Sequence, residues 1–260
     1  MERIGKNHEV IKMIKDINKS NHYKNYIASD DLEVLRIVIN NRLVIPYLIY
    51  SYEKAYQDDT QILLQQLIQK AKNCYEISNH TYDMIKQKEN HAGIIAIIEL
   101  PQFNFHDLGD FIIILDHLEI PGNIGTIYRT LDACGASGVI LVDSITKRNN
   151  IKLTASARGT NLILPTIDAK YEDTLNFLLE NDYTIYLGEP KLGISYHDYD
   201  YKGKIAIVVG NERFGIHEDW YNHSHQKVFI PMKGSNNSLN VGVAASILAY
   251  EAAIKRKTFL

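Results

Sequence analysis

The sequence predicts an α/β protein of two parts: a smaller amino-terminal α/β domain and a carboxyl-terminal domain built on a mostly parallel sheet. Two observations lead to this expectation. In the second half of the chain, apolar runs alternate with segments of helical periodicity, which is typical of a parallel sheet covered by helices on both faces. Pro101 to Gly109 is rich in turn-forming residues and is the best linker. The expected boundaries are therefore 1–100, a linker at 101–109, and 110–260.

The first domain contains two helical and two strand-like segments. Val10, Ile14 and Ile17 recur at helical spacing, whereas residues 43–50 form an apolar run that resembles a strand despite Pro46. The predicted elements are a helix over 7–18, a strand over 43–50, a helix over 61–72 and a buried strand over 93–100. Together they indicate a small α/β domain with a core of its own.

The second domain contains five short apolar runs that are predicted to be strands. They cover residues 111–115, 139–142, 184–187, 205–209 and 228–230. After the first run, apolar residues at helical spacing predict a helix, namely Ile124, Ile127, Leu131 and Cys134. Asn123 would cap the start of this helix and Gly135 would end it. A further helix is predicted from about residue 239 to residue 255.

A polar loop that contains Gly234 separates the strand at 228–230 from the apolar helix that follows it. In open α/β sheets, ligands collect at the carboxyl ends of strands, where this loop lies. The simpler interpretation is a capping turn that binds nothing, in which Asn237 or Ser238 satisfies the first free amides of the helix. Taken alone, the loop favours that simpler interpretation.

Two further loops change this balance. One follows the strand at 111–115 and carries Arg129, which falls on roughly the opposite side of its helix from the apolar stripe. The other runs from Gly210 to Gly215 after the strand at 205–209, and its glycines indicate close backbone approach or positive φ. Separately, these loops could hold a solvated arginine and an ordinary glycine turn. Three polar loops in one half of the chain are less easily dismissed than one.

The three loops resemble the motifs of the SpoU/TrmH family of RNA ribose 2′-O-methyltransferases, within the SPOUT superfamily. They correspond to residues 123–129, 210–215 and 230–240. The positions that match the family pattern are Asn123, Gly125, Arg129, Gly210, Glu212, Gly215, Pro231, Met232, Ser238, Leu239 and Asn240. One departure is Gly242, where many relatives carry a serine. The resemblance covers roughly residues 111–255 with specific motifs and residues 1–100 more loosely.

The resemblance implies a fold, a reaction and partners. The second domain would be a SPOUT methyltransferase domain with a trefoil knot, and the first an RNA-binding domain related to a ribosomal-protein fold. S-adenosylmethionine would donate a methyl group to a ribose 2′-hydroxyl of RNA, without a metal. Within the family, the chain looks most like the thiostrepton-resistance type, which methylates an adenosine in 23S ribosomal RNA. The family is homodimeric through its carboxyl-terminal domain, so the same is expected here.

The resemblance also assigns roles to residues. Arg129 is the main catalytic candidate, as an electrostatic stabiliser that grips the substrate phosphate. The polar side chains that would orient Arg129 and the ribose, and complete the catalytic set, are Asn123, Glu212, Ser238 and Asn240. The cofactor would lie among main-chain groups of Leu187, Gly210, Ile230, Met232 and Leu239.

Charge placement is uneven along the chain. The formal net charge is -3, so RNA affinity would have to come from local basic segments. Residues 1–24 are rich in lysine, although a solvated helix face is an equally good interpretation there. Residues 144–161 contain no acidic residue, and their RNA-binding candidates are Lys147, Arg148 and Arg158.

Cysteine usage and hydropathy indicate a cytoplasmic, soluble protein. Cys74 and Cys134 show no paired or metal-like spacing, which is typical of a reducing compartment. The amino terminus lacks an apolar secretion core, and no apolar run approaches the roughly twenty residues of a membrane helix.

Three alternatives remain open from the residues. A transfer-RNA 2′-O-methyltransferase of the same family is one. A Rossmann-type oxidoreductase is another, because Gly122 and Gly125 open a helix after a strand and Asp143 ends the next strand, although the closely spaced Gly-x-Gly is lacking. The third is a non-catalytic RNA-binding module. Binding of S-adenosylmethionine, of a dinucleotide, or of RNA with neither cofactor would separate the methyltransferases from the other two.

Overall fold

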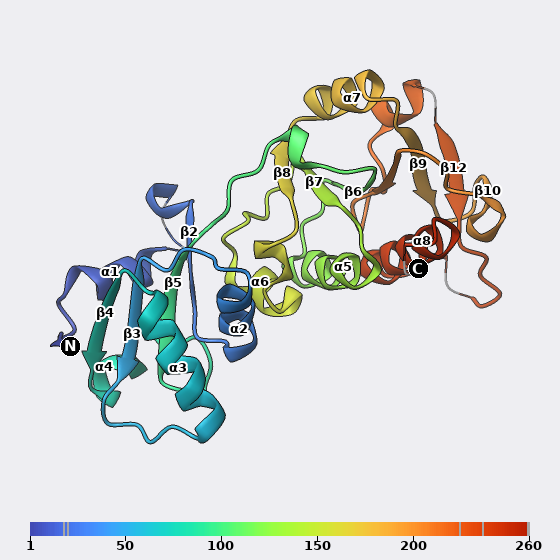
Figure 1. Ribbon diagram of the computed structural model, residues 1–260. Helices are drawn as coiled ribbons and strands as arrows, with labels where there is room; N and C mark the ends of the chain where they lie inside the picture. Colours follow the sequence, from blue (N-terminus) through green and yellow to red (C-terminus); the bar gives the residue numbers. More distant parts are fainter. Residues whose placement is uncertain (18, 20, 224, 236, 259–260) are drawn as a thin grey trace. The chain divides into compact units, whose positions relative to one another are not determined.

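The chain folds into two compact units (Figure 1). The computed structural model describes residues 1–17, 19, 21–223, 225–235 and 237–258. Unit 1 comprises Met1–Pro101 and Lys147–Ile163, and unit 2 comprises Gln102–Thr146 and Leu164–Leu260. The division near residue 101 lies at the start of the expected linker. Residues 147–163, which were expected in the second domain, group with unit 1.

Unit 1 is built on a five-stranded mixed sheet with the strand order β1-β4-β3-β5-β2. The strands are β1 (Glu2–Arg3), β2 (Tyr26–Ser29), β3 (Tyr47–Ser51), β4 (Asn73–Ile77) and β5 (Ile94–Glu99). The helices are α1 (Glu9–Asp16), α2 (Leu32–Asn40), α3 (Asp58–Lys70), α4 (Asn79–Asp83) and α6 (Ile151–Ala157), with short 3₁₀ helices η1 (Asn21–Tyr23) and η3 (Thr160–Leu162). The four predicted elements are present as α1, β3, α3 and β5, with bounds that differ by a few residues.

The apolar run of β5 divides between two cores. Ile94, Ala96 and Ile98 face one core together with the buried residues of α2 and α3. Ile95 and Ile97 face the other core, which contains the buried side chains of α1. Successive residues of a strand point to opposite faces, so a strand covered on both sides is continuously apolar. This double coverage explains the unbroken hydrophobic sequence of β5.

Residues 147–163 join unit 1 through specific contacts. Leu162 is fully buried in the same core as α2 and α3. The backbone at Gly159 has a φ of +87°, and a Cβ there would lie 3.3 Å from the Val34 Cα atom. Asn149 donates from its side-chain amide to the Ile17 carbonyl oxygen at 3.3 Å. These contacts are made with residues more than ninety positions away, so local sequence patterns could not reveal them.

Unit 2 is built on a seven-stranded sheet with the order β10-β12-β9-β11-β6-β7-β8, and every pairing in it is parallel. The strands are β6 (Phe111–Asp116), β7 (Gly138–Val142), β8 (Thr166–Ala169), β9 (Thr184–Glu189), β10 (Ile194–Ser195), β11 (Ile205–Val209) and β12 (Gln226–Phe229). The helices are α5 (Pro121–Cys134), α7 (Tyr171–Glu180) and α8 (Val241–Lys255), with short 3₁₀ helices η2 (Phe105–Asp107), η4 (Tyr196–Asp198) and η5 (Glu218–Asn222). All five predicted strands and the mostly parallel sheet are confirmed.

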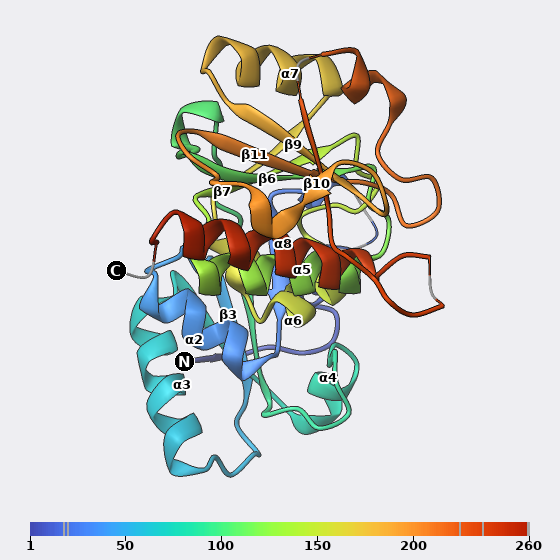
Figure 2. The same cartoon turned by 90° about the vertical axis from the view of Figure 1, so that its right-hand side faces the viewer.

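Helices cover both faces of the sheet in unit 2, as the alternating sequence pattern predicts. Figure 2 shows α7 on one face and α5 with α8 on the other. Helices α5 and α8 pack side by side, and the hydroxyls of Thr130 and Ser246 form a hydrogen bond of 2.8 Å between them. Because β6, β9, β11 and β12 are parallel neighbours in one part of the sheet, the loops that follow them leave from the same edge.

The starts of α5 and α8 differ from the predicted caps. Helix α5 begins at Pro121, with Ile120 as its N-cap, so Asn123 lies inside the first turn and does not cap it. Proline suits the first helical position because its amide hydrogen would have no partner there. Helix α8 is capped by Asn240, whose Oδ1 atom accepts from the Gly242 and Val243 amides, and not by Asn237 or Ser238. Gly135 ends α5 in the left-handed conformation, as predicted.

In the part of the chain that the structure describes, every helix is too short or too polar to cross a membrane.

Candidate functional site

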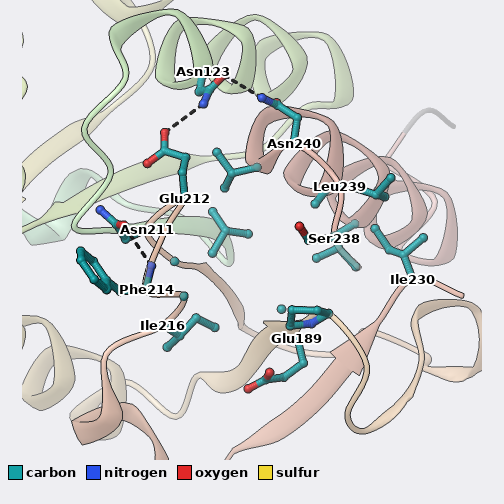
Figure 3. Close-up of a pocket in the computed structure, with 18 of the residues that line it drawn as sticks. Asn123, Glu189, Asn211, Glu212, Phe214, Ile216, Ile230, Ser238, Leu239 and Asn240 are labelled. Carbon is teal, nitrogen blue, oxygen red and sulfur yellow. Dashed lines mark hydrogen bonds between the residues drawn. The ribbon is translucent and has the colours of Figure 1, made fainter. Parts of the chain in front are cut away.

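A cavity of about 670 Å³ lies at the carboxyl edge of the sheet in unit 2. It is bounded by the first turn of α5, the end of β9, the loop after β11 and the segment that joins β12 to α8 (Figure 3). Eight of the residues predicted for the site line it: Asn123, Gly210, Glu212, Ile230, Met232, Ser238, Leu239 and Asn240. Three loops far apart in sequence therefore meet at one cavity.

Three of the predicted catalytic side chains form a hydrogen-bonded chain. Asn240 donates from Nδ2 to Asn123 Oδ1 at 3.1 Å, and Asn123 donates from Nδ2 to Glu212 Oε1 at 2.9 Å (Figure 3). The Oδ1 atom of Asn240 already accepts from the α8 amides, so its Nδ2 atom must face Asn123. The cap of α8 thus orients Asn123, and Asn123 in turn fixes one carboxylate oxygen of Glu212.

The loop after β11 is compact and depends on its two glycines. Asn211 and Gly215 exchange two backbone hydrogen bonds of 2.9 Å. A Cβ at Gly210 would lie 2.2 Å from the Gly215 carbonyl carbon, which leaves no room for any side chain. Gly215 has a φ of +76°, a conformation that L side chains rarely adopt. Both expectations for this loop, close approach and positive φ, are confirmed.

Asn211 is a site residue that the sequence pattern did not single out. Its Oδ1 atom accepts from the Arg213 amide at 2.9 Å and from the Phe214 amide at 3.2 Å. Its Nδ2 atom donates to the His117 carbonyl oxygen at 2.8 Å, which ties the loop to the end of β6. An asparagine that follows a glycine at the end of a strand, with a second glycine four residues later, is a signal for a turn, so the residue could have been found.

The end of β9 supplies another wall of the cavity. Leu187 is fully buried, and the next residue, Gly188, lines the cavity. A Cβ at Gly188 would lie 3.1 Å from the Val208 carbonyl oxygen and 3.2 Å from a methyl carbon of Leu248. Leu187 itself lies outside the described residues that line the cavity, and its neighbour Gly188 occupies the wall there.

A tyrosine and a carboxylate that the sequence did not indicate lie on the side of the cavity opposite Asn123. Tyr221 donates its hydroxyl to Glu189 Oε1, and Figure 3 shows Glu189 across the cavity from Asn123. Burial, together with the hydrogen bond to Glu189, raises the pKa of the Tyr221 phenol. The phenol therefore stays protonated at neutral pH and holds one oxygen of the carboxylate.

Arg129 differs from the other catalytic candidates. Its side chain is exposed on α5, and it lies outside the set of described residues that line the cavity. Arg129 is six positions after Asn123, which corresponds to roughly 9 Å along the helix axis and a different helix face. The structure confirms that Arg129 points away from the buried stripe of Ile124, Ile127 and Leu131, but it does not bring the guanidinium into this cavity.

The three RNA-binding candidates belong to unit 1. Lys147 and Arg158 are exposed, and Arg158 ends α6 in the left-handed conformation with a φ of 51°. Arg148 is half-buried and donates to the Pro101 carbonyl oxygen at 2.9 Å, which is a structural contact within the unit. Asn236, which belongs to the third sequence motif, lies outside the described residues.

Comparison with known proteins places these features in a family. The sequence model of the SpoU rRNA Methylase family matches residues 110–250. The 23S rRNA (guanosine(2553)-2′-O)-methyltransferase RlmP of Bacillus subtilis is 28% identical over 68% of this chain and 71% of its own length. The 23S rRNA (adenosine(1067)-2′-O)-methyltransferase of Streptomyces azureus is 31% identical over 67% of each chain.

Solved structures show the same fold. A crystal structure of an AdoMet-bound rRNA methyltransferase from Sinorhizobium meliloti superposes with a TM-score of 0.86 at 23% identity, over 100% of this chain and 98% of that one. The SpoU methyltransferase AviRb from Streptomyces viridochromogenes, in complex with AdoMet, gives a TM-score of 0.82 at 19% identity, over 96% and 100% of the two chains. With the family match over more than half of its residues, this chain belongs to the SpoU rRNA methylase family.

Proposed function

We propose that this protein transfers a methyl group from S-adenosylmethionine to a ribose 2′-hydroxyl of RNA, and that the RNA is 23S ribosomal RNA. The observation that carries the proposal is the Asn240–Asn123–Glu212 chain, which joins three distant loops at one cavity in a member of this family. The printed names of the relatives from Bacillus subtilis and Streptomyces azureus support 23S RNA as the substrate class.

The cavity fits a cofactor of this kind. Its volume of about 670 Å³ lies within the ordinary range of small-molecule sites. Gly210 leaves no space for a side chain and Gly188 leaves little, so main-chain groups form the walls beside them. Val228, Ile230 and Leu248 add apolar surface that would suit a flat purine ring. When bound, S-adenosylmethionine supplies an activated methyl group, so the protein needs only to position and polarise the acceptor.

The residues of this chain would act on the acceptor hydroxyl by orientation and charge. Glu212 has one oxygen bound to Asn123, and its other oxygen is available to accept a hydrogen bond from a ribose or an arginine. Ser238 is exposed on the wall of the cavity, and its hydroxyl can donate a hydrogen bond to the ribose or accept one from it. Holding the reacting atoms in line accounts for a large part of the rate acceleration in such transfers.

We further propose that the protein is a homodimer in which Arg129 acts in the cavity of the partner subunit. Arg129 is exposed and lies outside the described lining of the cavity in its own chain. On the neighbouring helix α8, Val243, Tyr250 and Ile254 are 46%, 41% and 58% exposed. Their spacing of seven and four residues places them on one helix face. An exposed apolar stripe on the helix that packs beside α5 suits burial against a second copy of the chain.

We infer that unit 1, with Lys147, Arg148 and Arg158 on its α6 region, binds the RNA substrate as a ribosomal-protein-like domain. We also infer that the segment between β12 and α8 forms part of a trefoil knot, as expected from the family resemblance. A substrate in transfer RNA would be the alternative within the same reaction.

In vitro methylation tests the proposed activity. Purified protein, S-adenosylmethionine with a tritiated methyl group, and unmodified 23S RNA transcribed in vitro should yield labelled RNA. Mapping of alkali-resistant linkages should then locate a single 2′-O-methylated ribose. Labelling of a transfer RNA pool in place of 23S RNA would shift the substrate to the alternative, and tight binding of NAD without S-adenosylmethionine would overturn the proposal.

A further inference from the structure

Phe214 is the most exposed large apolar residue at the cavity. Its side chain is 84% exposed, and it lines the mouth of the cavity together with Ile120, which is 49% exposed. Figure 3 shows its ring at the edge of the cavity, on the loop that carries Glu212. Isolated exposed apolar residues are ordinary on protein surfaces. A phenyl ring at the rim of a polar cavity, however, is in a position to contact a ligand that enters the cavity.

Hydrogen bonds within the loop fix the backbone at Phe214. The Asn211 side chain accepts from the Phe214 amide, and Asn211 and Gly215 close the loop with two backbone hydrogen bonds. Asn211 is itself only 8% exposed and is tied to the His117 carbonyl oxygen. These bonds fix the backbone that carries the ring, so little backbone ordering entropy would be lost when a ligand packs on it.

The charge beside the ring points to the kind of ligand. Arg213, the preceding residue, is exposed and also lines the cavity. A flat aromatic surface beside a guanidinium group is the chemistry that binds an unpaired nucleotide, because the ring stacks on the base and the cation attracts the phosphate.

We infer that Phe214 and Arg213 form a binding subsite for an unpaired RNA base at or beside the methylated nucleotide. The inference rests on the proposed function and adds residues to it. The ring of Phe214 stacks on the base, and Arg213 contacts an adjacent phosphate. The base-to-ring contact positions the ribose over the cavity and takes no part in the methyl transfer itself.

Steady-state kinetics test the subsite with Phe214→Ala on an unmodified 23S RNA transcript. Loss of one stacking contact should raise the KM for RNA roughly 5- to 150-fold. The value of kcat should stay within about twofold, because the contact is equally present in the ground and transition states. Phe214→Tyr and Phe214→Trp should restore the KM. Leu179→Ala, which removes a side chain 47% exposed on α7 in the same unit, is the matched control and should leave both constants unchanged.

Tryptophan fluorescence provides a readout specific to stacking. The chain has a single tryptophan, Trp220, which is 1% exposed, so Phe214→Trp adds one accessible fluorophore to a constant background. Bound RNA, followed independently by anisotropy of a labelled transcript, should quench the new emission. RNA binding without quenching would overturn the inference, even if the enzyme methylates normally.

Two further outcomes would also overturn it. A weaker affinity of Phe214→Ala for S-adenosylmethionine would place the ring on the cofactor, and a change in molecular mass would place it in a protein interface. Failure of the proposed function is distinguishable from all of these. In that case the transcript would bind both the wild type and Phe214→Trp and would quench the added emission of the variant, but neither protein would transfer a methyl group.

Discussion

Asn240 has two separable tasks, and both arise from the two ends of one amide. Its Oδ1 atom caps α8 through the Gly242 and Val243 amides, and its Nδ2 atom donates to Asn123. Asparagine caps well through its oxygen and still offers an amide donor. Two substitutions at this position can therefore separate the contribution of Asn240 to the free energy of unfolding from its contribution to the rate of methylation.

We expect Asn240→Ala to lower the free energy of unfolding by about 1 kcal/mol, through loss of the cap, and to slow methylation. Asn240→Asp keeps the capping oxygen and should retain most of the stability, but a carboxylate cannot donate to Asn123 Oδ1. Urea titration and single-turnover methylation measure the two effects. Full activity of Asn240→Asp would show that the amide chain to Glu212 is not needed for the reaction.

Gly210 is the residue whose backbone surroundings are tightest in the site. The two nearest atoms to an added Cβ, at 2.2 Å, are backbone atoms of Gly215 and Ile216, which cannot rotate away. We expect Gly210→Ala to open the Asn211–Gly215 loop and to weaken S-adenosylmethionine binding at least about tenfold, at a stability cost of about 1–3 kcal/mol. Calorimetric titration would measure the affinity.

Gly5→Ala is the control for Gly210→Ala, because space within 4 Å of a Cβ at Gly5 is empty. It should bind the cofactor like the wild type. Wild-type affinity in Gly210→Ala would mean that the loop does not form the cofactor wall.

At the scale of elements, residues 147–163 deserve a test because they group with unit 1. We expect Leu162→Ala to lower the free energy of unfolding by about 2–5 kcal/mol, the usual cost of truncating a fully buried leucine. Hydrogen exchange should speed up at the amides of α2 and α3, which share its core. Leu179→Ala, at an exposed position, should change neither quantity. Faster exchange confined to unit 2 would contradict the assignment.

The elements that the sequence revealed are those with a strong local pattern. The five apolar runs of unit 2 and the helix of Ile124 to Cys134 are buried on the expected sides, because burial of a strand or helix face leaves a periodic signal. Strand β8 (Thr166–Ala169) escaped notice because it is short and ends in Asp168 and Ala169. Residues 162–164 form one apolar run locally, yet the division between units falls after Ile163. Local hydropathy indicates that a residue is buried, but not in which core its side chain lies.

The site was predictable to the extent that residue types define its chemistry. The motif positions indicated Asn123, Glu212 and Asn240, but their hydrogen-bonded order depends on three loops meeting in space. The cap of α8 was placed at the wrong residue, since Asn237, Ser238 and Asn240 are all good capping types and only the backbone path selects among them. Glu189 and Tyr221 gave no sequence signal at all, because their pairing joins positions in separate loops.

At the scale of the whole molecule, the position of Arg129 bears on assembly. A homodimer with twofold symmetry would give each subunit's arginine to the other's cavity, and both sites would be complete only in the pair. The net charge of -3 does not oppose such association, whereas a large net charge would. The apolar stripe of Val243, Tyr250 and Ile254 supplies a surface to bury.

Mixing two inactive variants distinguishes an arginine that acts in the partner from one that acts in its own chain. We expect Arg129→Ala and Glu212→Ala each to retain the fold and the dimer and to lose methylation. When the two are unfolded and refolded together, about half of the dimers should be mixed. If Arg129 acts across the interface, each mixed dimer contains one cavity with an intact Glu212 that faces an intact Arg129. The mixture should then recover about a quarter of the wild-type rate. If Arg129 acts within its own subunit, every cavity lacks one of the two groups, and the mixture should be as inactive as its components. Light scattering on the same samples gives the mass, and a monomer at working concentrations would contradict the shared site directly.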